Sequence, residues 1–251
     1  MTPEMIDKLG ALLEKIESSD APADTPSEDR SDTEPDGQSC SDPDSVAAAE
    51  LIREHPLSPD PLLNELIFSM LMWESSIDHA TRSAERIDAE LVDLNEMRVC
   101  TIDELVSILS PRMPRAAERA ARVISVLNEI YDRENALSLL HLREHNKKSV
   151  LEYLDSIDGL PPYASARVVL LVLDWHAFPL DQRLAKLLAA HSIVTPSSRP
   201  AMQAAQLERG VRASDALRTY TCIERWAQTQ RVTTRSRKTR QSRKSTKGLS
   251  S

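Results

Sequence analysis

Residues 45–228 contain one helix-forming segment after another, and this pattern limits the fold more than any other feature of the sequence. Leucine and alanine recur at helical spacing, the whole chain has only five glycines, and β-branched residues form no alternating runs. The pattern predicts an all-α fold. No apolar stretch approaches the roughly 20 residues of a membrane span, and the N-terminus has no signal-like apolar block. We therefore expect an intracellular, cytoplasmic protein with no membrane partner.

Local signals mark several helices. Residues 61–73 are strongly apolar and predict a buried helix, and the run Thr101-Ile-Asp-Glu104 predicts a capping box. Further helices are expected over residues 114–130, 149–157, 164–174, 181–191 and 213–228.

The chain divides into four parts by composition. Residues 1–16 predict a short amphipathic helix, and residues 17–44, with ten Asp and Glu against one Arg, predict a disordered acidic linker. Residues 45–228 form the helical domain. Residues 229–251 predict a disordered basic tail, which is interpreted either as a nucleic-acid contact or as a solubilising segment. The cations proposed to bind DNA are Arg235, Arg237, Lys238, Arg240, Arg243 and Lys244.

The cysteines and histidines indicate no cofactor. Cys40, Cys100 and Cys222 are scattered, which excludes a disulfide framework and an iron–sulfur cluster. The six histidines do not cluster with Cys, Asp or Glu at a ligand spacing, so we expect no metal site.

Two segments carry the functional argument. In residues 154–166 a helix ends, a turn with Gly159 and Pro161 follows, and a second helix starts at once. Such a hairpin directs backbone N–H groups and the positive end of a helix dipole outward, which favours a phosphate. The second segment is Phe178-Pro-Leu-Asp181, directly before another helix.

Together the two segments resemble the helix-hairpin-helix DNA-glycosylase superfamily, the endonuclease III and MutY-like proteins. The hairpin of that family reads roughly Leu-Pro-Gly-Val-Gly-x-Lys-Thr-Ala, or has Tyr in place of Lys, and residues 157–165 align with it without a gap. The second signature of the family is an apolar-Pro-Val-Asp segment, which Phe178-Pro-Leu-Asp181 matches. The separation of Tyr163 and Asp181 agrees with the spacing of the two signatures in endonuclease III. The resemblance covers residues 55–195 and implies a two-lobed helical fold that acts on double-stranded DNA.

The resemblance also implies a reaction, in which a damaged or mismatched base is flipped out and its N-glycosidic bond is hydrolysed during base excision repair. It implies Asp181 as the essential carboxylate, with Tyr163 beside it. Bifunctional members carry lysine at the position of Tyr163, and tyrosine has no amine for a Schiff base, so a monofunctional enzyme without lyase activity is expected. Glu74 falls where members place the residue that fills the gap left by the base. The hairpin contacts implied are Gly159, Leu160, Pro161, Pro162 and Ser165.

Other interpretations stay open. Asp181 directly precedes a helix and is also explained as a plain N-cap, and Glu74 as an exposed helix end. Pro161 replaces the second glycine of the hairpin and removes a phosphate donor. Removing the tail's eight positive charges and the linker's net nine negative charges from the total of −8 leaves about −7 on the rest, unusual for a partner of DNA. The cations that could gather on one face are Arg112, Arg115, Arg119, Arg122, Arg183 and Lys186.

Two alternatives to an enzyme follow from these departures. The first is a non-catalytic DNA-binding or interaction protein on the same fold, which the change at Pro161 and the acidic domain favour. The second is a helical protein unrelated to DNA. The retained Asp181 favours the glycosylase.

Overall fold

The computed structural model describes residues 2–20, 57–196 and 199–241, with residues 231–241 as helix backbone. Within these ranges every regular element is a helix, which confirms the all-α prediction. The elements are α1 (Pro3–Asp20), α3 (Pro61–Met72), α4 (Ile77–Glu90), α5 (Leu94–Val99), α6 (Ile102–Ile108), α7 (Ala116–Glu134), η1 (Leu140–Glu144), α8 (Lys147–Asp155), α9 (Pro162–Leu171), α10 (Gln182–Ala190), α11 (Pro200–Gly210), η2 (Ala213–Asp215) and α12 (Ala216–Gln241).

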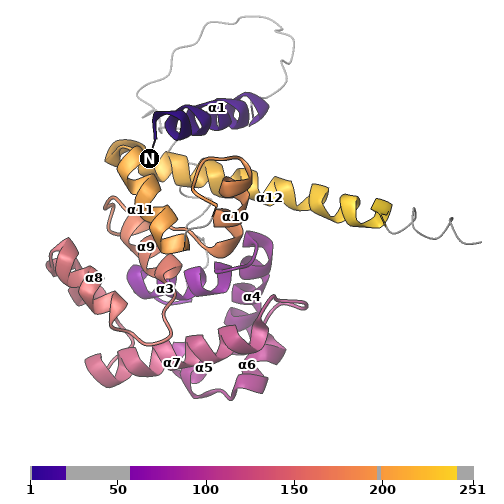
Figure 1. Cartoon of the computed structure of the whole chain (residues 1–251). Coiled ribbons are helices and arrows are strands. Elements are labelled where there is room, and N and C mark those ends of the chain that lie inside the picture. The colour runs from indigo at the N-terminus through magenta and orange to yellow at the C-terminus, as the bar shows by residue number, and fades with distance from the viewer. Residues whose placement is uncertain (1, 21–56, 197–198, 242–251) are drawn as a thin grey trace, which may run out of the picture.

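The helices form two lobes around a central pair (Figure 1). Helices α4 to α7 lie together at the bottom of the view, whereas α1, α10, α11 and α12 lie at the top. Between the lobes α3 packs against α9, and it also contacts α4 and α7. Helix α3 is apolar on nearly every side, which is typical of a fully buried helix, and Leu62, Leu66 and Leu71 have no exposed surface.

Polar residues fix where the helices begin. Asp60 is the N-cap of α3, because its Oδ1 accepts hydrogen bonds from the backbone N–H groups of Leu62 (2.8 Å) and Leu63 (3.3 Å). The capping box predicted at Thr101 is present at the start of α6: the Thr101 hydroxyl accepts from the backbone of Glu104, whose side chain accepts from Thr101 N–H. Helix α9 begins at Pro162, two residues before the predicted start, because proline suits the first helical turn.

The first and last helices are longer than the sequence predicts. Helix α1 continues to Asp20, past the expected end at residue 16, and packs against α12. Helix α12 continues to Gln241, so that part of the segment assigned to an unstructured tail is helical. The predictions for residues 21–44 and 242–251 lie outside the described residues. None of the described helices is both long and apolar enough to cross a lipid bilayer.

Candidate active site

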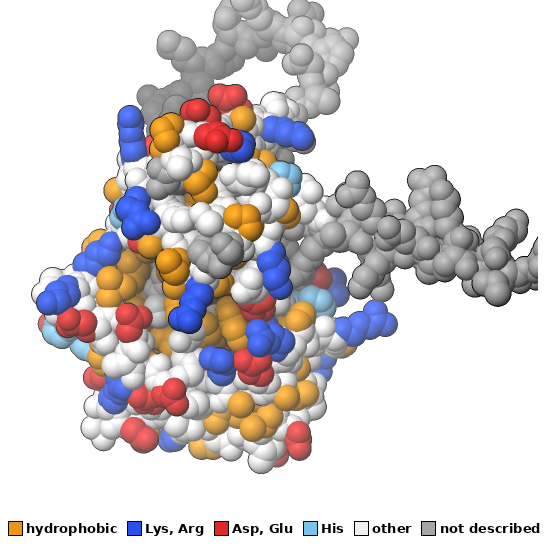
Figure 2. All heavy atoms as spheres, in the orientation of Figure 1, with side chains coloured by type: hydrophobic (Ala, Val, Ile, Leu, Met, Phe, Trp, Pro, Cys, Tyr) orange, Lys and Arg blue, Asp and Glu red, His pale blue; other side chains and the backbone are white. Residues whose placement is uncertain are grey.

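A cavity of about 720 Å³ lies between the two lobes. The lower side contributes Trp73, Glu74 and Arg115, and the upper side contributes residues of α9, α10 and α11. Figure 2 shows a hollow on this face of the molecule, with hydrophobic side chains inside it and Lys and Arg side chains near its edge. Tyr163 and Asp181 both line the cavity, as the spacing of the two sequence segments predicts.

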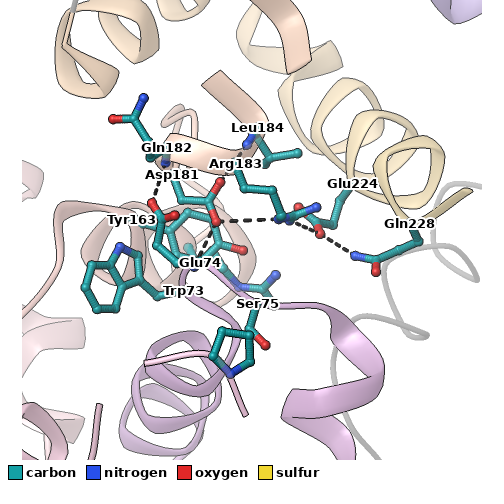
Figure 3. Close-up of polar contacts among 12 residues, drawn as sticks. Trp73, Glu74, Ser75, Tyr163, Asp181, Gln182, Arg183, Leu184, Glu224 and Gln228 are labelled. Atoms are coloured by element: carbon teal, nitrogen blue, oxygen red, sulfur yellow. Dashed lines mark hydrogen bonds and ion pairs between the residues drawn. The ribbon is translucent and has the colours of Figure 1, made fainter. Parts of the chain in front are cut away.

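Asp181 is positioned by both of its carboxylate oxygens. It is the N-cap of α10, because its Oδ1 accepts a hydrogen bond from Leu184 N–H at 2.8 Å. Its Oδ2 accepts from the backbone N–H of Glu74 at 2.9 Å, across the sequence from the end of α3 (Figure 3). The residue is 2 % exposed. The N-cap interpretation is therefore correct as geometry, and the same contacts hold the carboxylate at the wall of the cavity.

Glu74 completes a reciprocal pair of contacts with the start of α10. While its N–H donates to Asp181, its own Oε1 accepts from Gln182 N–H at 2.7 Å (Figure 3). Its φ of 54° lies in the left-handed region, which lets α3 end and turn here. Partial burial and then the charge of Asp181 raise the pKa of the Glu74 carboxyl. The carboxyl groups that line the cavity are those of Glu74, Asp181 and Glu208, and the first two are joined through the start of α10.

Tyr163 belongs to a buried polar network rather than to solvent. Its hydroxyl lies 3.1 Å from that of Tyr220, which also accepts from Arg167 Nη1 at 2.7 Å. Arg167 Nε in turn donates to Glu65 Oε1 at 2.8 Å, so the network joins α3, α9 and α12. Burial, followed by the effect of Tyr220, raises the pKa of Tyr163 well above its usual value, and Tyr163 is a neutral phenol at neutral pH.

The hairpin between α8 and α9 has few backbone donors left for a phosphate. Pro161 and Pro162 have no N–H, Asp158 N–H donates to Glu129 Oε2 at 2.8 Å, and Leu160 N–H donates to the carbonyl of Ile157 at 3.3 Å. Gly159 has φ of 82°, a conformation that glycine adopts without steric cost, and its carbonyl accepts from Arg122 Nη1 at 3.0 Å.

The hairpin side chains differ in accessibility. Pro162 is exposed, and Gly159 and Leu160 are half-buried. Pro161 and Ser165 are buried, so their side chains do not present themselves to a ligand at the surface. The Ser165 side chain, which the resemblance implied as a DNA contact, is therefore covered by the protein in this structure.

The six cations that were expected to share one face do not all reach the surface in the structure. Arg119 is buried, and Arg183 is half-buried and paired with Glu224, so including them in a DNA-facing surface was wrong. Arg119 donates to the carbonyls of Met70, Trp73 (2.6 Å) and Pro114 (3.2 Å). It caps the end of α3, just below the left-handed turn at Glu74, and burial lowers its pKa to about 10, with a contribution from Arg115.

Other cations lie at the cavity. Arg115, Lys186 and Arg199 line it from the start of α7, from α10 and from the residue before α11. Arg115 pairs with Glu118 at 2.8 Å and also lies over the Trp73 ring. Neither Lys186 nor Arg199 has an ion-pair partner in the described part of the chain. Arg199 and α11 were not predicted from the sequence, although Pro200 at the first helical position is a signal for a helix start.

The remaining predicted cations, Arg235 to Lys244, lie where the structure describes no side chains. Among the described residues no group of three or more His, Cys, Asp or Glu could hold a metal ion.

Comparison with known proteins identifies the fold through structure alone. No protein-family model matches the sequence, and neither does any curated protein. The structure is similar to 3-methyladenine DNA glycosylase (MagIII) of H. pylori bound to 1,N6-ethenoadenine, with TM-score 0.57 and 12 % identity, over 90 % of this chain and 98 % of that one. It is also similar to endonuclease III in a trapped covalent intermediate with DNA, with TM-score 0.53 and 10 % identity, over 72 % of this chain and 81 % of that one.

Proposed function

Because the chain has the fold of the helix-hairpin-helix DNA glycosylases, we propose that it is a monofunctional DNA glycosylase that removes a damaged or mismatched base. The observation that carries the proposal is Asp181, a buried carboxylate held by two backbone amides at the wall of a cavity between the lobes. A plain N-cap would need neither the second amide nor the cavity.

The chemistry assigned to Asp181 is hydrolysis of the bond between C1′ and the base nitrogen. As that bond breaks, the base leaves with the bonding electrons and C1′ gains positive charge, which a fixed carboxylate stabilises. A water oxygen then bonds to C1′ and its proton passes to Asp181. A volume of about 720 Å³ lies within the range of ordinary ligand pockets, and the lining of Trp73, Tyr163 and Phe178 suits the flat aromatic face of a base.

The phosphate contacts are assigned to cations around the cavity rather than to the hairpin. Lys186 and Arg199 have no acidic partner in the described ranges, so no ion pair has to break before they bind a phosphate. Residues 231–251 add eight Lys and Arg after the body of α12, and we assign them to non-specific attraction of duplex DNA.

The decisive experiment is base release from a panel of duplexes that carry uracil, thymine–guanine mismatches, oxidised guanine or alkylated bases. We expect at least one duplex to give sites that break only after alkali is added. Asp181→Asn is the matched control, because asparagine keeps the N-cap but removes the charge. If no duplex gives alkali-labile sites above that control, the non-catalytic interpretation replaces the enzyme.

Absence of lyase activity is tested by trapping with borohydride. Lys186 is the lysine that lines the cavity, so it is the amine to examine in place of the lysine missing at Tyr163. We expect no covalent adduct with the wild-type chain, and Tyr163→Lys to introduce one. An adduct that the wild-type chain forms and Lys186→Ala loses would show that the enzyme is bifunctional.

The second candidate is a DNA-binding protein on the same fold that does no chemistry. The hairpin favours it, because two prolines and two internal hydrogen bonds occupy the positions from which amides would contact a phosphate. Tight, salt-dependent binding of duplexes that is equal for wild type and Asp181→Asn, with no base released from any of them, would support this candidate.

A further inference from the structure

We propose that Arg183 and Glu224 are a pair of positioning residues that set the charge balance and orientation of Asp181 from the side away from the cavity. The catalytic readout of this inference rests on the proposed function, whereas the behaviour of the Asp181 carboxyl can be measured without it. Through Glu224 the pair connects α12 to the candidate active site.

The geometry places Arg183 between two carboxylates. Its Nε lies 3.6 Å from Asp181 Oδ2, within ion-pair distance, and its Nη2 pairs with Glu224 Oε1. Gln228 Nε2 donates to that same Glu224 oxygen at 2.6 Å (Figure 3). The Asp181 and Glu224 side chains are 0 % and 1 % exposed, and that of Arg183 is 15 % exposed. One guanidinium therefore serves two carboxylates that are both shielded from water.

Stability alone does not account for this arrangement. A buried ion pair gains little over apolar residues of the same volume, because desolvation costs as much as the attraction returns. Here the pair is also incompletely satisfied, since Glu224 Oε2 and the Arg183 atoms Nε and Nη1 have no hydrogen-bond partner in the described structure. The contact of Arg183 Nε with Asp181 is therefore an ion pair without a hydrogen bond. Burial raises the pKa of Glu224, and Asp181 adds to this, while Arg183 opposes it. The fold keeps the pair despite these costs, beside the carboxylate that the chemistry needs.

The other contacts of Asp181 do not supply a nearby positive charge of this kind. Two of its hydrogen bonds come from backbone amides, which carry only partial charge. The charged or titratable groups that act on it from the surrounding elements are Glu74, Arg119, Tyr163, Arg183 and Glu224. Of these Arg183 is the cation within ion-pair distance, and Glu224 is the anion that partly cancels it.

The test uses two variants with effects of opposite sign. In Glu224→Gln the shape is kept and the net charge beside Asp181 rises by one, so the charged carboxylate is favoured. In Arg183→Met the cation is lost while Glu224 remains, so the charged carboxylate is disfavoured. We expect the titration midpoint of the Asp181 carboxyl to move down in the first variant and up in the second, each by about half to one pH unit. Arg183→Lys should restore most of the wild-type behaviour, because it keeps the charge.

The midpoint is measured by ¹³C NMR of the full chain labelled at aspartate side-chain carboxyls, with Asp181→Asn used to assign the resonance. Glu134→Gln is the matched control, since Glu134 is a partly buried carboxylate paired with Tyr153 and His141, outside the cavity lining. Loss of fold would change every resonance in both variants, and it would not give shifts of opposite sign. Unchanged midpoints in both variants, or shifts of the same sign, would overturn the inference.

The pH profile of base release then separates this inference from the proposed function. If the enzyme is active, the acid limb of the profile should move in the same two directions as the NMR midpoint. Opposite NMR shifts with no base release from the wild-type chain would leave the pair established and the glycosylase rejected. Base release with unchanged Asp181 midpoints would support the glycosylase and reject the role of Arg183 and Glu224.

Discussion

The first turns of α9 and α10 both border the cavity, yet they are built in opposite ways. Helix α9 begins at two prolines, with no side-chain cap, and the amides of the preceding turn are partly used within the protein. Helix α10 begins at Asp181, whose carboxylate caps the helix and also accepts a hydrogen bond from the end of α3. The difference indicates that the chain maintains its candidate catalytic centre while its hairpin offers little to a phosphate.

The ion pairs near Asp181 and those near the hairpin also differ, in how deeply they are buried. The ion pairs Glu65–Arg167 and Arg183–Glu224 both lie behind the cavity, on α3, α9, α10 and α12. Around the hairpin, ion pairs such as Glu129 with Arg133 are more exposed, which is typical of surface pairs that contribute little stability. Charge kept out of water near Asp181 suits a site that needs fixed electrostatics.

The largest expected difference between the two helix starts is in folding stability. Asp181→Ala removes the cap and leaves a partly buried Glu74 N–H without an acceptor, which should lower the free energy of unfolding by roughly 2–4 kcal/mol. Pro161→Ala removes no side-chain cap and should cost less than about 1 kcal/mol. Urea unfolding measures both values. Equal losses for the two variants would mean that Asp181 is not the stronger anchor. Asp181→Asn should lose less stability than Asp181→Ala but more than none, because its single amide oxygen can keep only one of the two hydrogen bonds that Asp181 accepts.

The second prediction concerns which cations hold the duplex. The double variant Lys186→Ala with Arg199→Ala should weaken non-specific binding on the order of 10–100-fold at 0.1 M salt, and reduce the slope of log affinity against log salt by about two. The matched control is Lys8→Ala with Arg82→Ala, which removes two exposed cations from α1 and α4. If the slope of log affinity against log salt were the same in the test and control variants, the duplex would have to bind away from the cavity.

Restoring a backbone N–H at position 162 should slightly strengthen the binding of DNA by the hairpin. Pro162 is exposed at the first position of α9, where an N–H has no partner within the helix. Pro162→Ala should therefore tighten duplex binding by about 2–10-fold, the value of one added hydrogen bond. Fluorescence anisotropy with a short duplex measures it. An unchanged affinity would show that the hairpin does not approach the sugar-phosphate backbone of the DNA. The start of α9 would then differ from the start of α10 in function as well as in structure.

The smallest effect is the pH dependence at Glu74. Its folded-state pKa is raised, so the folded chain binds the proton more tightly than the unfolded chain, and the stability from this site falls as pH rises through that value. Glu74→Gln mimics the protonated form and should raise Tm by about 1–2 °C at pH 7, a modest value because the group is half-exposed. The increase in Tm should vanish at a pH below the usual pKa range of glutamate, where Glu74 itself is protonated. A gain that persists there would point to packing rather than charge.

The sequence predicted the features that depend on neighbouring residues. The capping box at Thr101 and the buried helix after Asp60 follow from short patterns. The placement of Tyr163 beside Asp181 in one cavity agrees with what the family resemblance implied. Features that join distant residues were missed. Glu65 and Arg167 are each a single charge in an otherwise apolar helix, a signal that each needs a partner, but nothing local shows that they pair across the fold.

The same limit explains why the basic surface was overestimated from the sequence. Arg119 was among the cations that could gather on one face. In the folded protein it is 1 % exposed, because the end of α3 needs a donor for its free carbonyls. Which cation reaches solvent therefore depends on a helix end located far away in the sequence.

The packing of α1 against α12 sets an order of events during protein synthesis. Helices α4 to α7 are contiguous in sequence and can assemble as soon as they emerge from the ribosome. Helix α1 is made first, but its partner begins at Ala216, which at ordinary elongation rates arrives on the order of 10–40 s later. During that interval Leu9, Leu12 and Ile16 have no surface to cover them. Exposed apolar surface on a partly made chain favours aggregation, so we expect α1 to need protection until α12 is complete.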